Sequence, residues 1–279
     1  MKRIFALILL TLPGWGLVCG LPPARAGLPQ PMCVYYGQAR DGFGQPYLAN
    51  ADVILRRGTN EIARHTINGS LSPGVNFALY AHLDDGRSAQ DYSRRALHSG
   101  DRVSIFVRDA TGEQVIMENQ TVPPVGSPGE LVLINATAAE DADGDGLPDS
   151  WERELIVWSG GWLQTLEDVR GEDDFDGDGM SNWQEYRAGT FAYLEYDCFY
   201  VEYLGAASNR LCMTFLSVPG KVYSACATTN LTPAVWTPCP FSFTAAGPPQ
   251  FIAAEGNGDW LSFFVPMDAE PRYFRLVVE

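Results

Sequence analysis

The sequence contains little of what most catalytic sites require. It has only three histidines in 279 residues, and it lacks the G-x-S-x-G, H-E-x-x-H, P-loop and G-x-G-x-x-G motifs. These absences leave no sequence signature of a serine hydrolase, a zinc protease, a nucleotide hydrolase or a dinucleotide-dependent enzyme. One histidine, His82, is followed by acids at Asp84 and Asp85. This is the only candidate acid/base group that the sequence offers, and an acid/base site is the less favoured interpretation of it. We therefore expect a protein that is not an enzyme.

Basic charge and long apolar runs are also scarce. The chain has 19 Lys and Arg residues against 34 Asp and Glu residues, and residues 140–185 alone hold 15 acids and two bases, a net charge of −13. Without a basic patch to neutralise phosphates, nucleic acid is not an expected partner. After residue 26, no stretch approaches the ~18 apolar residues that a membrane-spanning helix needs. We therefore expect no transmembrane segment after signal cleavage.

The one long apolar run stands at the N-terminus, where it fits a secretory signal peptide. Lys2 and Arg3 precede the apolar segment 4–12, and residues 24–26 (Ala-Arg-Ala) form a small-x-small cleavage pattern. We predict that residues 1–26 are removed and that the mature protein is secreted or held at the cell surface.

Cysteine is sparse, and neither C-x-x-C nor a Cys/His zinc spacing occurs. Cys19 would anchor a lipoprotein as an alternative to secretion, although Gly16 and Val18 fit the usual lipidation context poorly. The mature chain contains Cys33, Cys198, Cys212, Cys226 and Cys239. An exported protein permits disulfides, and the last four cysteines allow three connectivities that the sequence does not separate. Buried thiols on strands are the equal alternative.

The chain does contain a repeated acidic loop. The first copy runs from Asp141 to Glu152, and the second, 33 residues later, from Asp174 to Glu185. Positions 1, 3 and 5 are Asp in both copies, and position 6 is Gly, which turns sharply at no steric cost. Position 7 offers a backbone carbonyl, position 9 a direct or water-mediated oxygen, and position 12 a bidentate Glu. A hard cation that takes six to eight oxygen ligands needs this spacing. The sequence therefore predicts two calcium ions.

The predicted calcium ligands are Asp141, Asp143, Asp145, Leu147, Asp149 and Glu152 in the first loop, and Asp174, Asp176, Asp178, Met180, Asn182 and Glu185 in the second. The competing interpretation is a solvated acidic turn. Crowded carboxylates repel one another by about 1 kcal/mol per close pair even under solvent screening, and a divalent ion removes that conflict. Two complete copies favour the ion sites.

The loops differ from those of calcium-sensing EF-hands. Residues 130–135, before the first loop, predict a strand instead of an entering helix, and position 8 is Pro148 in one copy and Ser181 in the other. Proline has no N–H for the backbone bridge that pairs EF-hands. The segments DADGDGLPDSWE and DFDGDGMSNWQEYRAGT resemble the loop-plus-one-helix sites of dockerins and of thrombospondin type 3 repeats in secreted bacterial proteins, over about 50 of the 279 residues. The resemblance implies calcium-stabilised spacers or docking modules in an extracellular protein.

The rest of the chain predicts a mainly β protein with two β-sandwich-like domains joined by a short helical segment that carries the two EF-hand-like loops. We expect a signal peptide at 1–26, the first β-domain at 27–138, the calcium-binding connector at 139–190 and the second β-domain at 191–279. Strands are predicted at 51–55, 61–67, 75–81, 102–107, 114–117 and 131–134, and again at 199–203, 211–216, 222–226, 260–265 and 273–278. Pro219-Gly220 between two of these strands predicts a hairpin.

The connector has the spacing of short amphipathic helices. Asp149 and Glu152 are placed as a capping pair for a first helix that ends at Gly160, a second is expected at 162–169, and a third starts at Trp183 and stops at Gly189. Four tryptophans lie here: Trp151, Trp158, Trp162 and Trp183. We predict that they form a small core between the two ion sites, and exposed rings that stack on a sugar or a partner are the alternative.

Two hypotheses from different classes follow. The first is a non-enzymatic exported protein in which calcium fixes the geometry of two β-domains that bind or assemble at the cell surface, with an extracellular protein as partner. The second is a carbohydrate-active protein, an accessory binding module or a weak glycoside hydrolase, that uses exposed aromatic rings or paired carboxylates on a polysaccharide. We favour the first, because no catalytic motif is present and most candidate acids are assigned to the ions.

Overall fold

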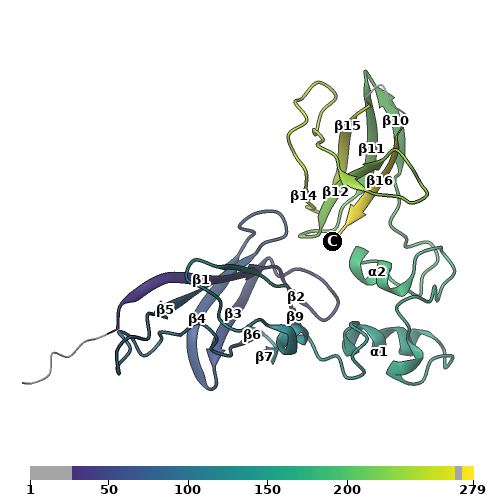
Figure 1. The fold of residues 1–279 in the computed structure, drawn as a ribbon. Helices are drawn as coiled ribbons and strands as arrows, with labels where there is room; N and C mark the ends of the chain where they lie inside the picture. The colour runs from purple at the N-terminus through teal and green to yellow at the C-terminus, as the bar shows by residue number, and fades with distance from the viewer. Residues whose placement is uncertain (1–26, 268–271) are drawn as a thin grey trace, which may run out of the picture.

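The computed structural model describes residues 27–267 and 272–279 (Figure 1). The described elements are mainly β-strands, with two α-helices in the middle of the chain. The mainly β fold class expected from the sequence is therefore confirmed. The predicted signal peptide, residues 1–26, lies outside the described residues.

Three successive parts make up the described chain. The N-terminal part contains β1 (Pro29–Gly37), β2 (Ala39–Asp41), β3 (Ala49–Arg57), β4 (Asn60–Asn68), β5 (Phe77–Asp84), β6 (Ser104–Asp109), β7 (Gly112–Val115), the 3₁₀ helix η1 (Met117–Thr121), β8 (Leu131–Leu133) and β9 (Ala136–Ala138). The middle part contains α1 (Asp149–Trp158), the 3₁₀ helix η2 (Leu166–Asp168) and α2 (Asn182–Ala188). The C-terminal part contains β10 (Tyr203–Ala207), β11 (Arg210–Leu216), β12 (Val222–Thr228), β13 (Thr237–Pro238), β14 (Ala254–Glu255), β15 (Trp260–Pro266) and β16 (Tyr273–Val278).

Two sheets of the N-terminal part share one hydrophobic core. One sheet has the order β5-β1-β8 and the other β4-β3-β6-β7, while β2 and β9 form a short parallel pair. Tyr35 and Leu79 from the first sheet, and Val53 and Ile105 from the second, are fully buried in this core. Ile105 and Val107 are both buried, as the alternation of this strand predicted.

All six strands predicted for the N-terminal part overlap observed strands, but β1, β2 and β9 were not predicted. In β1 the prolines Pro29 and Pro31 argue against a strand at the sequence level, because proline cannot donate a hydrogen bond within a sheet. The ladder between β1 and β5 accordingly shifts register between Gln30 and Cys33, and β1 is regular only from Cys33 onward.

The C-terminal part also has two sheets around one core. β11 is central in the order β10-β11-β15, and β12 pairs with β13, β14 and β16 in the other sheet. Four of the five predicted strands are confirmed, and the strand predicted at 199–203 is wrong. The strand begins only at Tyr203. Phe199 instead packs its ring against Phe215 and Tyr223, with centroid distances of 5.8 and 5.6 Å, so its apolar character reflects core packing.

The Pro219-Gly220 turn joins the two C-terminal sheets and does not form a hairpin. The tight turn is present, since Gly220 has φ 78° and the N–H of Lys221 donates to the carbonyl of Val218 at 3.2 Å. However, β11 and β12 on either side of it pair with different strands. The hairpin prediction is wrong because Pro-Gly specifies a reversal of the chain but not the sheet in which the next strand pairs.

The helices α1 and α2 pack through aromatic side chains in a third buried cluster. Tyr186 of α2 contacts Trp151 of α1 edge-on at a centroid distance of 6.0 Å, and it contacts Trp183 in the same way at 6.1 Å. Leu147 and Leu155 are fully buried in this cluster. The predicted third helix is confirmed as α2, which ends at Ala188 before a Gly189 with φ 81°.

Two of the four connector tryptophans contradict the predicted core. Trp158 is 60% exposed and Trp162 is 87% exposed. Helix α1 ends at Trp158, whose ring stacks on Tyr193 at the surface with a centroid distance of 5.0 Å. Beyond this point only η2 forms where a second helix was predicted, so Trp162 has no helical face to bury.

The capping pair predicted for α1 is also wrong. The N-cap residue is Pro148, which makes no side-chain capping bond. Asp149 and Glu152 both lie inside the first turn, and both are buried. Asp149 instead accepts hydrogen bonds from the N–H of Ala142 and from Arg153.

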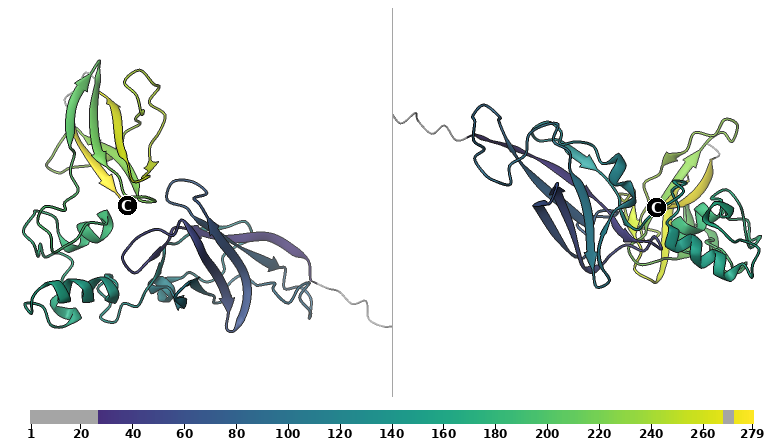
Figure 2. Two further views of the ribbon diagram at one scale, coloured as in Figure 1. Left: turned by 180° about the vertical axis from the view of Figure 1, so that it is seen from behind. Right: turned by 90° about the horizontal axis from the view of Figure 1, so that it is seen from below.

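The three parts meet around the turn at Gly220. Gln38 Nε2 of the N-terminal part donates to the carbonyl of Gly220 at 3.0 Å, and Lys221 Nζ of the C-terminal part donates to the carbonyl of Tyr186 in α2 at 3.3 Å. Figure 2 shows the helices beside both β-rich parts in each view. Two consecutive residues of this turn therefore connect the C-terminal part to the N-terminal part and to α2.

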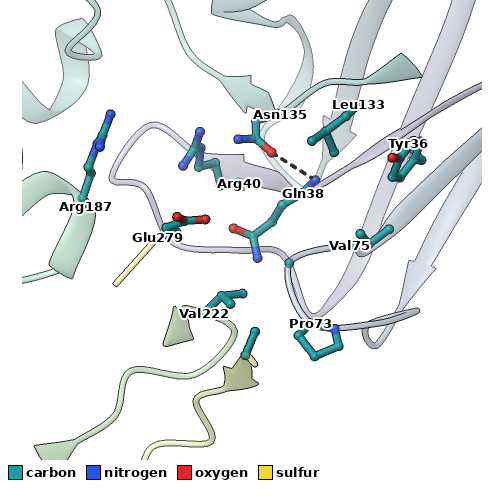
Figure 3. Close-up of a pocket in the computed structure, with 12 residues that line it drawn as sticks. Tyr36, Gln38, Arg40, Pro73, Val75, Leu133, Asn135, Arg187, Val222 and Glu279 are labelled. Carbon is teal, nitrogen blue, oxygen red and sulfur yellow. Dashed lines mark hydrogen bonds between the residues drawn. The ribbon is translucent and has the colours of Figure 1, made fainter. Parts of the chain in front are cut away.

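A cavity of about 520 Å³ lies at this junction (Figure 3). Its lining includes Gln38, Arg40 and Asn135 from the N-terminal part, Arg187 from α2, and Val222 and Glu279 from the C-terminal part. Charged side chains of all three parts thus face one space.

Within the described residues, no helix combines the length and apolar character needed to cross a membrane. Among the cysteines, Cys33, Cys212 and Cys226 are buried, and Cys198 is half-buried. These four form no disulfide in the described structure.

Candidate metal centre

Both acidic loops fold into the same hydrogen-bonded turn. In the first loop, the carboxylate of Asp141 accepts hydrogen bonds from the N–H groups of Gly144 (2.7 Å) and Gly146 (3.1 Å). The equivalent bonds of the second loop run to Asp174 from Gly177 (2.8 Å) and Gly179 (3.0 Å). The repeat in the sequence is therefore a repeat in local structure.

The glycine at position 6 is required by its backbone conformation. Gly146 has φ 94° and Gly179 has φ 98°, a region that side chains with a Cβ rarely adopt. The N–H of the next residue, Leu147, then donates to Asp145 at 2.7 Å. This turn brings the aspartates at positions 1, 3 and 5 to one side of the loop.

The three aspartates of each loop converge on one point. In the first loop, one carboxylate oxygen from each of Asp141, Asp143 and Asp145 lies within 4.8 Å of the others. The second loop brings Asp174, Asp176 and Asp178 together in the same way. Each group is spaced so that a single cation could contact all three carboxylates.

Glu152 and Glu185, at position 12 of the two loops, lie in the protein interior. Both residues are 0% exposed, and none of their four carboxylate oxygens has a hydrogen-bond partner among the described residues. Glu152 lies on α1 and Glu185 on α2, and repulsion from the aspartates of its own loop acts on each of them. A buried carboxylate without a partner is costly, whereas a buried carboxylate that binds a metal is not.

The surroundings raise the pKa of Glu152 and the pKa of Glu185 to about 8. Burial is the main cause for each, and repulsion from the aspartates of the same loop is the next. Burial also raises the pKa of Asp145 and the pKa of Asp176. Each group of acids therefore resists full ionisation unless positive charge is added to it.

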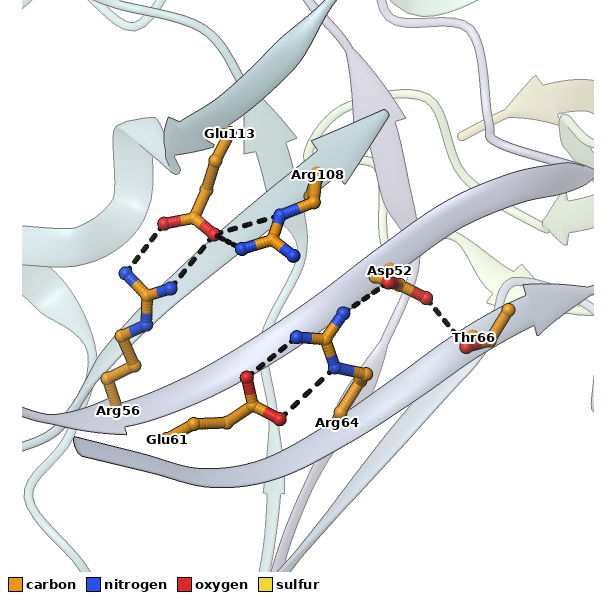
Figure 4. Close-up of polar contacts among 7 residues, drawn as sticks. All are labelled: Asp52, Arg56, Glu61, Arg64, Thr66, Arg108 and Glu113. Atoms are coloured by element: carbon orange, nitrogen blue, oxygen red, sulfur yellow. Dashed lines mark hydrogen bonds and ion pairs between the residues drawn. The ribbon is translucent and has the colours of Figure 1, made fainter. Parts of the chain in front are cut away.

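Several acids of the N-terminal part are neutralised by arginine. On the sheet β4-β3-β6-β7, Glu113 contacts both Arg56 and Arg108, and Arg64 bridges two further acids (Figure 4). In contrast, within the described residues none of the aspartates at positions 1, 3 and 5 forms an ion pair with a basic side chain. A bound cation would be the neutralising partner in these loops.

Position 9 differs between the loops. Both carboxylate oxygens of Asp149 are engaged, one by the N–H of Ala142 (2.7 Å) and the other by Arg153 Nη2 (2.6 Å). Asn182 donates through Nδ2 to the carbonyl of Arg170 (2.7 Å), and its buried Oδ1 has no partner. Asn182 thus has an unpartnered oxygen for a cation, whereas each oxygen of Asp149 already accepts one hydrogen bond, one of them from the cationic Arg153. The link between Asp149 and Arg153 was missed from the sequence, although an i, i+4 spacing on a helix could have indicated it.

The side chains at position 7 take no part in the acidic groups. Leu147 is buried in the aromatic cluster, and the sulfur of Met180 accepts a hydrogen bond from the N–H of Phe199 at 3.1 Å. Only their backbone carbonyls fit the role that the sequence predicts, and that role stays a prediction.

The group of His82, Asp84 and Asp85 suggested by the sequence does not form. His82 is exposed, whereas the side chain of Asp84 is fully buried and lies near His98, with Oδ1 at 3.9 Å from Nε2. Alternation along β5 was the available signal, but the loop that returns His98 to the end of this strand cannot be read from spacing.

Comparisons with family models, with curated proteins and with solved structures found no match. The assignment of the two loops therefore depends on their own residues. All predicted donors are oxygen atoms, and three or more carboxylates at each loop supply the charge and the number of ligands that calcium prefers.

Proposed function

We propose that this chain is a non-enzymatic, exported calcium-binding protein, in which two calcium ions make the middle part a rigid connector between two β-sandwich-like domains. The observation that carries the proposal is the complete burial of Glu152 and Glu185 with all of their carboxylate oxygens unpartnered. Two such side chains, each next to three converging aspartates, are explained together by one cation at each loop.

Calcium suits these loops better than the other common divalent ions. Each loop offers carboxylates and an expected backbone carbonyl, with no histidine or cysteine among its twelve residues. Zinc prefers nitrogen and sulfur ligands, and magnesium keeps most of its water and requires a strict octahedron. A loop with up to six protein donors matches the flexible, high coordination of calcium.

The ions would stabilise the part of the chain that has the least support of its own. Residues 140–185 combine a charge of −13 with two short helices and one small aromatic cluster. A site with a dissociation constant near 10 μM, in about 1 mM calcium, gains about 2.7 kcal/mol by mass action, and two sites gain about twice that. This gain is comparable with the whole stability of a small domain.

Tyr186 connects the second site to both β-rich parts. It directly follows the ligand Glu185, and its carbonyl accepts the hydrogen bond from Lys221 of the C-terminal part. Its ring also packs against Gly44 of the N-terminal part, where an added Cβ would stand 2.9 Å from the ring. A calcium ion that fixes Glu185 therefore also fixes the residue on which the two β-domains meet.

Exported proteins with such a connector serve as binding or assembly units outside the cell, in line with the dockerin and thrombospondin type 3 resemblance of the loops. Small-angle scattering tests the connector directly. In calcium we expect a single compact shape, and with chelator a larger radius of gyration as the two β-domains separate. An unchanged radius of gyration would mean that calcium does not set the arrangement of the domains.

Carbohydrate binding is the second candidate, and one observation favours it. A hollow of about 460 Å³ beside the end of α2 has three exposed aromatic residues in its lining, Tyr196, Tyr200 and Trp260, which are 78%, 55% and 54% exposed. Aromatic rings of this kind stack on sugars. Binding to insoluble polysaccharides, measured with calcium and with chelator, separates this candidate from the first, since only a carbohydrate-binding protein is retained.

A further inference from the structure

A third group of metal-ligating side chains lies in the N-terminal part, outside the two acidic loops. It contains Asp84 at the end of β5, Asp91 in the following loop, and His98 before β6. One ligand atom from each residue lies within 4.8 Å of the other two. His98 Nε2 is 3.3 Å from Asp91 Oδ1 and 3.9 Å from Asp84 Oδ1. A small cation placed among these atoms would reach all three.

Asp84 is held rigidly in this group. Its side chain is 0% exposed, and its two oxygens accept hydrogen bonds from the N–H groups of Gly86 (2.8 Å) and Tyr92 (2.9 Å). Gly27 packs directly on the carboxylate, since an added Cβ would stand 1.9 Å from Oδ2. A carboxylate oxygen that accepts one hydrogen bond keeps a second lone pair for a cation. The buried residue is therefore positioned without its ligand capacity being used up.

The backbone of His98 is fixed by Asp101. Its N–H donates to Asp101 Oδ2 at 3.0 Å, and the same oxygen pairs with Arg57 at 2.9 Å. This contact holds the residue from which the imidazole projects. Nε2 is the atom that faces Asp84 and Asp91.

We propose that Asp84, Asp91 and His98 form a third metal site, which binds zinc. One imidazole nitrogen and two carboxylate oxygens, with the remaining positions filled by water, are an accepted ligand set for this ion. Calcium does not prefer imidazole, so the protein would separate two metals by ligand type: calcium in the all-oxygen loops and zinc beside His98.

The site would join segments that are otherwise connected by a long loop. Asp84 ends β5, His98 follows the backbone pairing of Leu97 with this strand, and Asp91 lies midway along the loop between them. Zinc would hold the middle of this loop against its two ends.

Calorimetry with zinc chloride, on protein saturated with calcium, tests the proposal. We expect one zinc ion per chain, with an affinity at least about tenfold lower in His98→Gln and in Asp91→Asn. Both side chains are partly exposed, so neither substitution disturbs the core. The matched control is His82→Gln, which changes an exposed histidine on β5 and should keep the affinity of the unmodified protein.

Nuclear magnetic resonance of the histidine rings supplies a second measurement, because the chain has only three histidines. Zinc should shift the ring nitrogens of His98 and leave those of His65 and His82 unchanged. The competing arrangement is a protonated His98 that pairs with the two carboxylates without any metal. Zinc binding that is equally strong in His98→Gln, or no binding and no shift of the His98 ring, would overturn the proposal.

Discussion

The indole of Trp183, in the second acidic loop, lies against Gly146 of the first loop, where an added Cβ would stand 3.0 Å from Trp183 Cζ2. The same ring covers Gly171, at a distance that leaves no room for any side chain there. Trp183 lies two residues before the predicted ligand Glu185. One side chain thus contacts both acidic loops.

This contact predicts that the two calcium sites are coupled. Asp178→Ala removes a ligand only from the second site, and we expect it to lower the calcium affinity of the first site by about fivefold, the lower end of typical coupling between sites. In a Trp183→Ala background the same substitution should have no such remote effect. Calorimetry on the two single variants and the double variant measures the coupling. Trp162→Ala, which changes an exposed tryptophan, is the control, and an unchanged first-site affinity in Asp178→Ala would contradict the coupling.

Substitution of the buried glutamates should have opposite effects with and without calcium. Glu152→Gln and Glu185→Gln each remove a ligand, so each should abolish most of the calcium-dependent rise in melting temperature contributed by its own site. In chelator the same variants should melt at a higher temperature than the unmodified protein, because a neutral amide replaces a buried carboxylate. Glu167→Gln, at an exposed position of η2, should change the melting temperature neither with calcium nor in chelator. Variants that are less stable in chelator would show that these glutamates have structural partners.

The raised pKa of the two glutamates predicts the pH dependence of the calcium-free protein. Their pKa rises from 4.5 to about 8 on folding, so the fold favours their protonated form. The contribution of each to stability is complete below about pH 4.5 and is lost as the pH rises through about 8. One pKa unit corresponds to about 1.4 kcal/mol, so the free energy of unfolding should change by several kcal/mol over this pH range. The melting temperature in chelator should therefore fall between pH 5 and pH 7.

The control for this measurement is the double variant Glu152→Gln/Glu185→Gln, in which the melting temperature should depend less on pH. Lys221 acts in the opposite direction, because burial lowers its pKa to about 7, and its effect falls mainly above the chosen window. With calcium present the melting temperature should instead rise from pH 5 to pH 7, since calcium and protons compete for the same carboxylates. A calcium-free protein that becomes more stable from pH 5 to pH 7 would contradict the assigned burial.

Limited proteolysis shows which part of the chain unfolds when calcium is withdrawn. Arg153 on α1 and Arg170 between the loops are both exposed, and we expect the folded, calcium-bound connector to protect them from trypsin. With chelator we expect cleavage at these two arginines and two resistant fragments, near residues 27–150 and 190–279. Calcium should protect both bonds. Cleavage that begins inside either β-rich part, or that ignores calcium, would mean that the loops do not hold the connector together.

The local features of this protein were predictable from the sequence where a short motif determines the structure. The two loops, the helix from Asn182 to Ala188 and the strand around Ile105 each depend on residues within one or two turns of one another. The convergence of the loop aspartates follows from the spacing of positions 1, 3 and 5, so the amino-acid spacing alone is enough to predict that part of the candidate site.

Features that depend on distant contacts were not predictable in the same way. The Pro219-Gly220 turn fits a hairpin, yet β12 finds its partners in a different sheet from β11. Trp162 has a helical spacing to its neighbours, but no helix forms and the ring stays exposed. The ion pair of Asp149 with Arg153 competes with the predicted role of Asp149 as a calcium ligand. The approach of His98 to Asp84 requires the whole loop after β5.

The central claim is that each acidic loop binds one calcium ion, and titration calorimetry of the decalcified protein tests it most directly. We expect two calcium ions per chain. Asp145→Ala should remove the first site and leave one ion, and Asp178→Ala should remove the second and leave one. A stoichiometry of zero in the unmodified protein, or two ions still bound in either variant, would contradict the claim.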